Sequence, residues 1–278
     1  PMLFISVVSG KGGVGKSTIA ALIAAKLSKQ APTLLLDFDI CGPSIGNIFP
    51  ASGKVVKTRT GLKPLQVNNS SLYILSMSSL IKNDSSVIWR APRKLQLYEM
   101  FYNSAYENIL QNTTESDPDS YDILDKHNNI GNKTAQKNVT VDESCQLGYK
   151  YVVIDTPPGI TIVHSFIKEK NTKILLVTTS QNVAISDSIN TINFFGKISG
   201  IIENMSGLKC PNCKKITNIY SRNGGSQLAE EFNIPFYGTL EIDQNISQFI
   251  ENGTLYENIN SLGCNNVLDT VVRKLVGS

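Results

Sequence analysis

Residues 10–17 read Gly-Lys-Gly-Gly-Val-Gly-Lys-Ser, and this stretch decides the fold. It follows an apolar run over residues 3–8 and precedes an alanine-rich pattern with helical spacing over residues 18–27. A strand therefore leads into the stretch and a helix leaves it, which is the setting of a phosphate-binding loop, or P-loop. Its glycines let backbone N–H groups turn inward, and the start of the helix adds a positive end. The sequence thus predicts a cradle for a nucleoside triphosphate.

The positions of the P-loop have separate expected tasks. Lys16 is expected to reach the terminal phosphates, and the Ser17 hydroxyl is expected to bind Mg²⁺. The other positions offer backbone amides to phosphate oxygens. The predicted nucleotide contacts of this segment are Gly10, Lys11, Gly12, Gly13, Val14, Gly15, Lys16, Ser17 and Thr18.

Lys11 adds a second lysine to the same loop. Two ammonium groups in one cradle would repel each other, so the charge of Lys11 is expected to serve a phosphate held by a partner subunit. In this respect the loop resembles that of the deviant P-loop ATPases, a group of dimerising switches in which this lysine reaches across a nucleotide sandwich. The resemblance implies a catalytic role for Lys11 beside Lys16. The alternative is an ordinary solvated lysine.

Length and composition set the remaining bounds. A chain of 278 residues can bury one substantial α/β core, and we expect a single domain over residues 1–278. The net charge is +3 and the basic residues are scattered, so neither a nucleic-acid surface nor a membrane patch is predicted. The sequence shows neither an apolar run of membrane-spanning length nor a secretion signal, and we expect a cytosolic protein. Five unevenly spaced cysteines disfavour a disulfide framework.

Acidic residues follow two of the predicted strands. Asp37 and Asp39 come directly after an apolar run over residues 33–36, and Asp155 follows another over residues 149–154. Carboxylates at strand ends beside a phosphate loop are placed for metal and water. We expect Asp37 and Asp155 to support Mg²⁺ and Asp39 to orient the attacking water. For Asp37 the alternative is that it caps the next turn.

Three further motifs resemble those of the Mrp-type, or nucleotide-binding-protein-type, iron–sulfur cluster carriers. They are the first switch at residues 37–44, the Asp-Thr-Pro-Pro-Gly second switch at residues 155–159, and the Met-Ser-Gly-x-x-Cys-Pro-x-Cys run at residues 205–213. Two departures stand out. Ala91 stands where the family has a glycine. Residues 160–163, just after the second switch, lack the acidic pair that the family has there, although the histidine that follows is present as His164.

Cys210 and Cys213 form the only close cysteine pair, and neighbouring lysines favour their thiolates. On its own such a pair also suits a redox dithiol or zinc. It supplies two ligands, whereas tetrahedral zinc and a cubane cluster each need four. A two-fold dimer would present the pair twice. One 4Fe-4S cluster between two subunits is therefore our hypothesis, and the resemblance implies the same.

The resemblance also implies two contacts near the nucleotide base. Asn204, at the end of a predicted strand, would hydrogen-bond the adenine edge, although an asparagine there also suits a turn. Pro235 belongs to an Ile-Pro-x-x-Gly segment that is similar to a loop of the family near the base.

Strands alternate with helices along most of the chain. Further strands are predicted over 72–77, 173–179, 200–205 and 234–240, and helices over 94–110, 183–195, 224–232 and 267–276. Between them, residues 111–148 are polar, and we expect a mobile, disordered insertion there. The pattern predicts an α/β fold, a doubly wound and mainly parallel sheet of the P-loop NTPase type with ligands at the strand carboxyl ends.

These observations predict an ATP-dependent iron–sulfur cluster carrier and a slow Mg²⁺-dependent ATPase. We expect ATP, Mg²⁺ and the shared cluster as ligands, a homodimer or a heterodimer with a paralogue, and apoprotein recipients. Two alternatives stay open: a partitioning switch of the same deviant P-loop type, and a zinc-bridged scaffold without enzymatic activity.

Overall fold

The computed structural model describes residues 2–39, 42, 44–51, 53, 55–56, 61–76, 91–106, 148–210, 213 and 215–277. The insertion predicted over residues 111–148 lies outside these ranges except for its last residue. The end of the helix predicted to reach residue 110 lies outside them too, as do Cys41 and Cys145.

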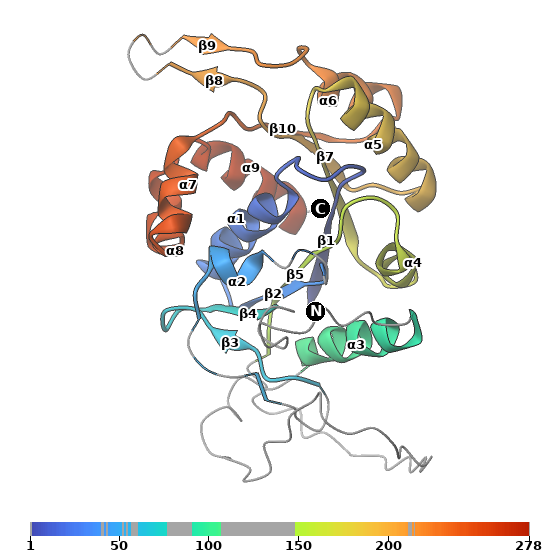
Figure 1. Cartoon of the computed structure of the whole chain (residues 1–278), viewed down its shortest axis with the longest axis vertical. Helices are drawn as coiled ribbons and strands as arrows, with labels where there is room; N and C mark the ends of the chain where they lie inside the picture. The colour runs from blue at the N-terminus through green and yellow to red at the C-terminus, as the bar shows by residue number, and fades with distance from the viewer. Residues whose placement is uncertain are drawn as a thin grey trace.

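A twisted sheet of eight strands runs through the described part of the chain (Figure 1). All neighbouring strands are parallel except the last pair, in which β3 runs antiparallel to β4. In spatial order the strands are β10 (Phe236–Thr239), β7 (Gly200–Glu203), β6 (Lys173–Thr178), β1 (Leu3–Val8), β5 (Tyr151–Asp155), β2 (Thr33–Asp37), β4 (Leu72–Ser76) and β3 (Leu65–Gln66). The order changes direction at β1, and the prediction of a doubly wound, mainly parallel sheet is confirmed.

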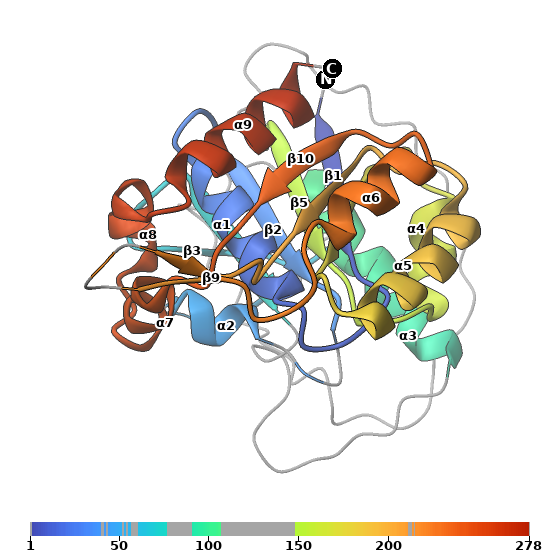
Figure 2. The same cartoon turned by 90° about the horizontal axis from the view of Figure 1, so that it is seen from above.

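Helices cover both faces of the sheet (Figures 1 and 2). One face carries α1 (Lys16–Ser28), α2 (Ile45–Ile48), α7 (Gln244–Glu251), α8 (Leu255–Asn258) and α9 (Asn265–Val276). The other carries α3 (Ala91–Asn103), α4 (Ile162–Lys168), α5 (Asn182–Phe195) and α6 (Gly224–Glu231). Because both faces are covered, the central strands are buried on both sides and read as continuous apolar runs.

The helix after the P-loop is enclosed on every side. Residues 19–28 of α1 are all buried, and the helix packs on β5, β2 and α9. Alanines allow this close approach of backbones. The charge in the last turn of the helix, Lys26, is neutralised by an ion pair of 2.6 Å with Asp269 of α9. The start of α1 is thus fixed to the sheet.

Most predicted elements are confirmed to within a few residues. Several short elements were not predicted: the helices α2, α4, α7 and α8 and the two-residue strands β3, β8 and β9. None of the helices in the described ranges combines the length and apolarity that crossing a lipid bilayer requires.

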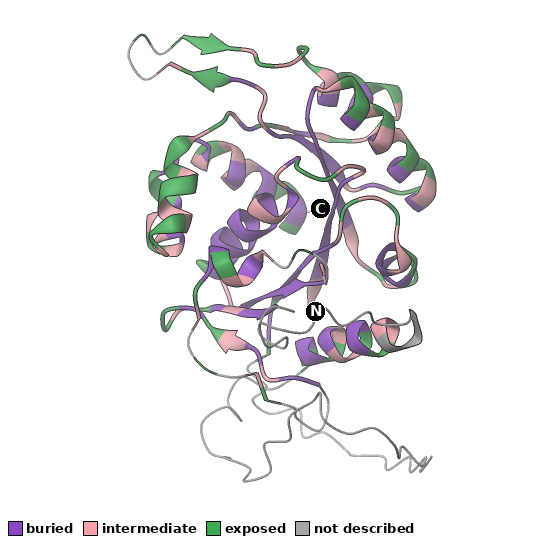
Figure 3. Ribbon diagram, in the orientation of Figure 1, coloured by how far each residue is buried: buried purple, intermediate pink, exposed green. Residues whose placement is uncertain are grey.

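A small antiparallel hairpin projects from the carboxyl edge of the sheet, at the top of Figure 1. It consists of β8 (Leu208–Lys209) and β9 (Ile216–Thr217), and we call residues 207–217 the cysteine hairpin. Its strands are exposed, as Figure 3 shows, in contrast to the buried strands of the main sheet.

Candidate functional site

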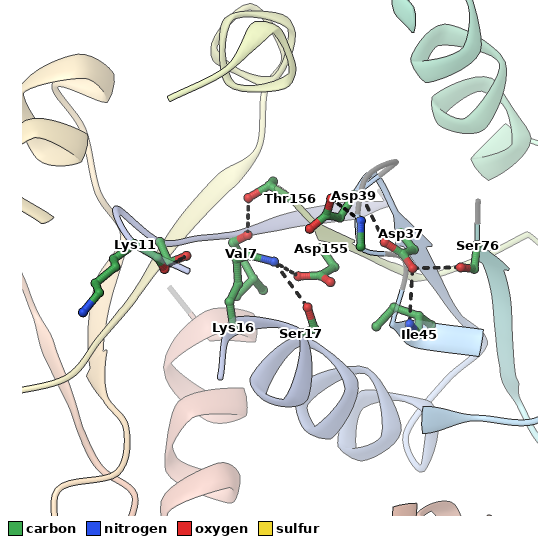
Figure 4. Close-up of polar contacts among 12 residues, drawn as sticks. Val7, Lys11, Lys16, Ser17, Asp37, Asp39, Ile45, Ser76, Asp155 and Thr156 are labelled. Atoms are coloured by element: carbon green, nitrogen blue, oxygen red, sulfur yellow. Dashed lines mark hydrogen bonds and ion pairs between the residues drawn. The ribbon is translucent and has the colours of Figure 1, made fainter. Parts of the chain in front are cut away.

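The P-loop and the acidic residues meet at one edge of the sheet. Asp155 is the register partner of Val7 on one side and of Asp37 on the other. β1 ends at Val8, and the P-loop begins two residues later at Gly10. The carboxyl ends of β1, β5 and β2 therefore bring together side chains that are far apart in sequence. Lys16, Ser17, Asp37, Asp39 and Asp155 gather there in Figure 4.

Lys16 and Asp155 form a buried ion pair. Lys16 Nζ lies 2.5 Å from Asp155 Oδ1, with side-chain exposures of 6% and 0%. The same ammonium group donates to Ser17 Oγ at 3.4 Å. Burial raises the pKa of Asp155, and the charge of Lys16 opposes this rise. To bind a phosphate oxygen, Lys16 would have to move from Asp155 to the nucleotide.

The second oxygen of Asp155 fits a role at a metal ion. Asp155 Oδ2 is buried and has no hydrogen-bond partner, which is costly for a carboxylate oxygen. Mg²⁺ prefers oxygen ligands and keeps several waters, so a metal-bound water would satisfy this atom. Ser17 and Asp155 are therefore the residues that fit a bound Mg²⁺, which in P-loop enzymes neutralises charge on the phosphates.

Asp37 is engaged by the protein itself. It accepts hydrogen bonds from Ser76 Oγ at 2.8 Å, from the Asp39 amide at 3.1 Å and from the Ile45 amide at 3.2 Å. Burial, and then the nearby charge of Asp155, raise its pKa to about 7. The alternative considered from the sequence, that Asp37 organises the following turn, is thus part of its role. Asp39 accepts from the Gly42 amide at 3.1 Å, and its side chain lies at the same edge.

The second switch is tied to the P-loop strand at two points. Thr156 Oγ1 donates to the Val7 carbonyl at 2.9 Å, and the Gly159 amide donates to the Ser9 carbonyl at 3.0 Å. Thr156 was not singled out from the sequence, because only its contact with β1 reveals the role. The segment 155–159 is therefore joined by hydrogen bonds to the chain that leads into the P-loop.

His164 fixes the far end of that segment. It closes a capping box at the start of α4, where its Nδ1 accepts from the Thr161 amide at 3.1 Å. Its Nε2 is buried without a hydrogen-bond partner. Burial, reinforced by the charge of Lys16, lowers the pKa of His164 to about 4. The imidazole is therefore neutral and serves to position the loop.

Lys11 points away from the cluster. Figure 4 shows its side chain directed away from Lys16, and its Nζ donates to Gln181 Oε1 at 3.1 Å. Gly10, beside it, packs so closely on α5 that an added Cβ would lie 2.3 Å from the Asp187 backbone. Lys11 thus occupies a separate position from Lys16, and its task at the phosphate of a partner remains a prediction. Gln181 had no signal in the sequence.

Asn204 lies against the P-loop. Its Nδ2 donates to the Val14 carbonyl at 2.9 Å, and a Cβ added to Gly15 would come within 2.2 Å of the same nitrogen. The structure therefore places Asn204 beside the P-loop, at the carboxyl edge of the sheet. Its predicted contact with the base remains a prediction.

Pro235 requires a correction. It precedes β10, which runs parallel to β7, so it lies at the amino edge of the sheet, opposite the P-loop. There it lines a pocket with Arg273 and Lys274 of α9. The segment near the carboxyl edge is the one after β10, where the Leu240 amide donates to the Glu203 carbonyl. Pro235 is therefore left out of the nucleotide site.

The cysteine pair lies on the hairpin, apart from the buried cluster. Cys210 is half-buried and Cys213 exposed, and the Cys210 amide donates to the Lys215 carbonyl at 2.9 Å. Leu208 and Ile216, on the two strands of the hairpin, have exposed apolar side chains, and so do Ile219, shortly after the hairpin, and Ile242, which forms a β-bridge with Leu208. Among the described residues, no group of three or more His, Cys, Asp or Glu side chains is gathered closely enough to hold a metal ion.

Comparison with protein families gives one match over most of the chain. Residues 2–110 and 142–276 match the family model described as ParA, NUBPL iron-transfer P-loop NTPase. The unmatched residues between these ranges fall inside the segment interpreted as an insertion.

Curated relatives are similar along nearly their whole length. The chain is 36% identical over 265 residues to a protein of Dictyostelium discoideum named cytosolic Fe-S cluster assembly factor NUBP2 homolog, covering 91% of this chain and 85% of that protein. It is 34% identical over 262 residues to the rat protein named cytosolic Fe-S cluster assembly factor NUBP2, covering 90% and 82%.

Solved structures show the same fold at lower identity. A nucleotide-binding protein of Archaeoglobus fulgidus in complex with ADP superposes with a TM-score of 0.63 at 23% identity, covering 92% of this chain and 88% of that one. The septum site-determining protein MinD of Pyrococcus horikoshii, complexed with Mg-ADP, gives 0.60 at 14% identity, covering 99% and 96%.

Proposed function

Because the chain belongs to the NUBPL iron-transfer P-loop NTPases, we propose that it is an ATP-dependent carrier that holds a 4Fe-4S cluster between two subunits and transfers it to apoproteins. The names of its relatives describe cytosolic iron–sulfur cluster assembly factors, and we propose the same setting for this chain. The cluster is cargo, and ATP with Mg²⁺ controls its loading or release.

The observation that carries the proposal is the position of the cysteine pair. Cys210 and Cys213 lie on an exposed hairpin at the same sheet edge as the P-loop. A pair supplies two thiolates and a cubane cluster needs four, so a second pair must come from another subunit. The exposed side chains of Leu208 and Ile216 beside the pair support an approach of that subunit.

The nucleotide site supports slow hydrolysis controlled by assembly. Lys16, Ser17 and Asp155 form a site for Mg-ATP in one chain, while Lys11 points away from it. We propose that Lys11 completes the site of the partner, which is the same chain or a paralogue. A cation supplied in trans would neutralise charge that develops on the phosphates.

Anaerobic reconstitution with iron and sulfide tests the cargo. We expect about four iron atoms per two chains in the wild type and their loss in Cys210→Ser. Cys264→Ala is the matched control, because Cys264 is buried and burial raises the pKa of its thiol to about 11. A full complement of iron in a monomer, or zinc in place of iron in anaerobically purified protein, would contradict the proposal.

Two lysine variants test the nucleotide roles. Lys16→Ala should abolish ATP binding, because the ammonium group that reaches the terminal phosphates is lost. Lys11→Ala should retain binding while turnover falls by about 10³-fold, if its charge acts like a cation supplied in trans. Calorimetry gives the affinities and phosphate release gives the rates. Equal loss of affinity in both variants would show that Lys11 acts in its own subunit.

A further inference from the structure

Two consecutive residues at the end of β7 contact two different parts of the molecule. Asn204 binds the P-loop, and Glu203 binds the segment that returns from the cysteine hairpin. Both side chains are buried, with exposures of 9% and 2%. Neither contact is local in sequence, so the fold alone brings them together.

The contact of Asn204 leaves little freedom between β7 and the P-loop. Its amide donates to the Val14 carbonyl at 2.9 Å, and the backbone of Asn204 is itself fixed to β6 through the Thr178 carbonyl at 2.8 Å. Gly15 faces the same amide without space for a Cβ. A change in the path of the P-loop must therefore displace the Asn204 side chain.

The contact of Glu203 fixes the start of α6. Glu203 Oε2 accepts from the Gly225 amide at 2.7 Å, and the neighbouring Gly224 amide donates to Ser180 Oγ at 3.3 Å. The fit is close on both sides, because a Cβ added to Gly225 would lie 2.9 Å from Glu203 Cβ. A carboxylate at this end of a helix is also favoured by the helix dipole.

The cysteine hairpin lies between these two anchors. The chain leaves β7 at Asn204, forms the hairpin and returns to the side chain of Glu203 through Gly225. At its base, a Cβ on Gly207 would meet the Ile216 side chain at 2.8 Å, so the two strands are locked together. The base of the hairpin also contacts the segment after β10, because the Ser206 amide donates to the Leu240 carbonyl at 3.0 Å and the Ile242 amide donates to the Gly207 carbonyl at 2.9 Å. Glu203 and Asn204 fix the chain on either side of the hairpin, at α6 and at the P-loop.

We propose that the end of β7 couples the nucleotide site to the cysteine pair, with Glu203 as the positioning residue that transmits a shift of Asn204 to the hairpin. This inference rests on the proposed function for the roles of the two sites. The coupling is reciprocal, since a ligand on the cysteines must change nucleotide affinity by the same factor. A shared element that both sites displace is the physical requirement for such coupling.

The alkylation rate of Cys210 and Cys213 tests the inference without a cluster. Peptide mass spectrometry would give the alkylation rate of each cysteine, once with Mg²⁺ and a non-hydrolysable ATP analogue and once without them. The quantity to compare between variants is the ratio of these two rates. The wild type should show a ratio that differs from one by about fivefold or more. Glu203→Ala should bring the ratio close to one while analogue affinity stays within about twofold, because Glu203 does not line the P-loop.

Three further variants make the result specific. Glu203→Gln keeps an acceptor for the Gly225 amide and should retain most of the wild-type ratio. Gly225→Ala crowds the same contact from the other side and should lower the ratio as Glu203→Ala does. Glu230→Gln, on the exposed side of α6, removes a carboxylate without touching the contact and should change nothing.

Two outcomes would overturn the inference. One is a wild type that binds the analogue but alkylates at the same rate with and without it. The other is a Glu203→Ala variant that keeps the full ratio, which is the result if a second subunit merely covers the hairpin. Failure of the proposed function is visible separately, as a wild type that binds no nucleotide or no iron.

Discussion

The P-loop and the cysteine hairpin lie at the same edge of the sheet but differ in how they are built. The P-loop is followed by a fully enclosed helix, and its functional groups are buried: Lys16 is 6% exposed and Asp155 is 0% exposed. The hairpin has strands of two residues, both exposed, and its apolar side chains face solvent.

The difference shows which site one chain can form by itself. At the P-loop, a single chain already gathers the lysine, the hydroxyl and the carboxylate, so nucleotide binding requires only that Lys16 exchange Asp155 for a phosphate oxygen. At the hairpin, one chain offers two thiols on an exposed element. Under the proposed function, a second pair of thiols from another subunit completes this site, and assembly is then the point of control.

Gly15→Ala should break the buried region most severely. Gly15 has a φ of +81° and a Cβ there would lie 2.2 Å from Asn204 Nδ2, so strain and a clash act together. We expect a loss of about 3 kcal/mol or more in the free energy of unfolding. Gly13→Ala is the matched control, with a φ of +80° and nothing within 4 Å of the added Cβ.

That control should cost only about 1 kcal/mol, from backbone strain alone. Urea denaturation of the two variants measures the difference. Equal losses would mean that the Asn204 contact adds nothing to the rigidity of the P-loop.

The next largest effect is expected in the pH dependence of stability, which depends on two buried groups near the P-loop. The pKa of His164 is lowered to about 4 in the folded chain, below its ordinary value of 6.5. Between these values the unfolded chain binds more protons, so stability falls as pH falls. We expect His164 to contribute a loss of about 2 kcal/mol from about pH 7 to about pH 5.

Asp37 changes the stability in the opposite direction, so its contribution must be separated from that of His164. Its pKa is raised to about 7, so the folded chain binds more protons than the unfolded one between about 4 and 7, and stability rises as pH falls. Comparing urea denaturation of the wild type with that of His164→Gln removes this common contribution. The variant should lack the loss assigned to His164. An unchanged difference between the two pH values would contradict the assignment.

The smallest effect is expected at the hairpin. Leu208 is 47% exposed, so Leu208→Ala should change the free energy of unfolding by no more than about 0.5 kcal/mol. Leu36→Ala makes the same chemical change at a fully buried strand position and should cost about 3 kcal/mol. A large loss in Leu208→Ala would mean that the hairpin packs as part of the core.

The sequence predicted the central sheet well because its signals are local. Strands such as β1 and β6 are continuous apolar runs, and the P-loop fixes the change from strand to helix. The carboxylates Asp37 and Asp155 were placed correctly at strand ends. Helix α7 was not predicted although Ile246, Phe249 and Ile250 have helical spacing, because its other residues are polar and asparagine-rich.

The contacts that define the site could not be predicted from pattern. Asn204 and Val14 are 190 positions apart, and Lys11 and Gln181 are 170 apart. Only the packed sheet decides which of these side chains meet. Pro235 shows the converse, because a motif resemblance identified the segment and the direction of β10 placed that residue at the other edge.

The enclosed helix α1 has a consequence for how the molecule opens. Its residues 19–28 are buried against the sheet and α9, so we expect their amide hydrogens to exchange with solvent deuterium only when the surrounding core unfolds. We expect the amides of the exposed strands β8 and β9 to exchange through small local openings instead. If the hairpin carries the proposed cargo, that cargo can therefore be exchanged by a local opening while the buried nucleotide site stays folded.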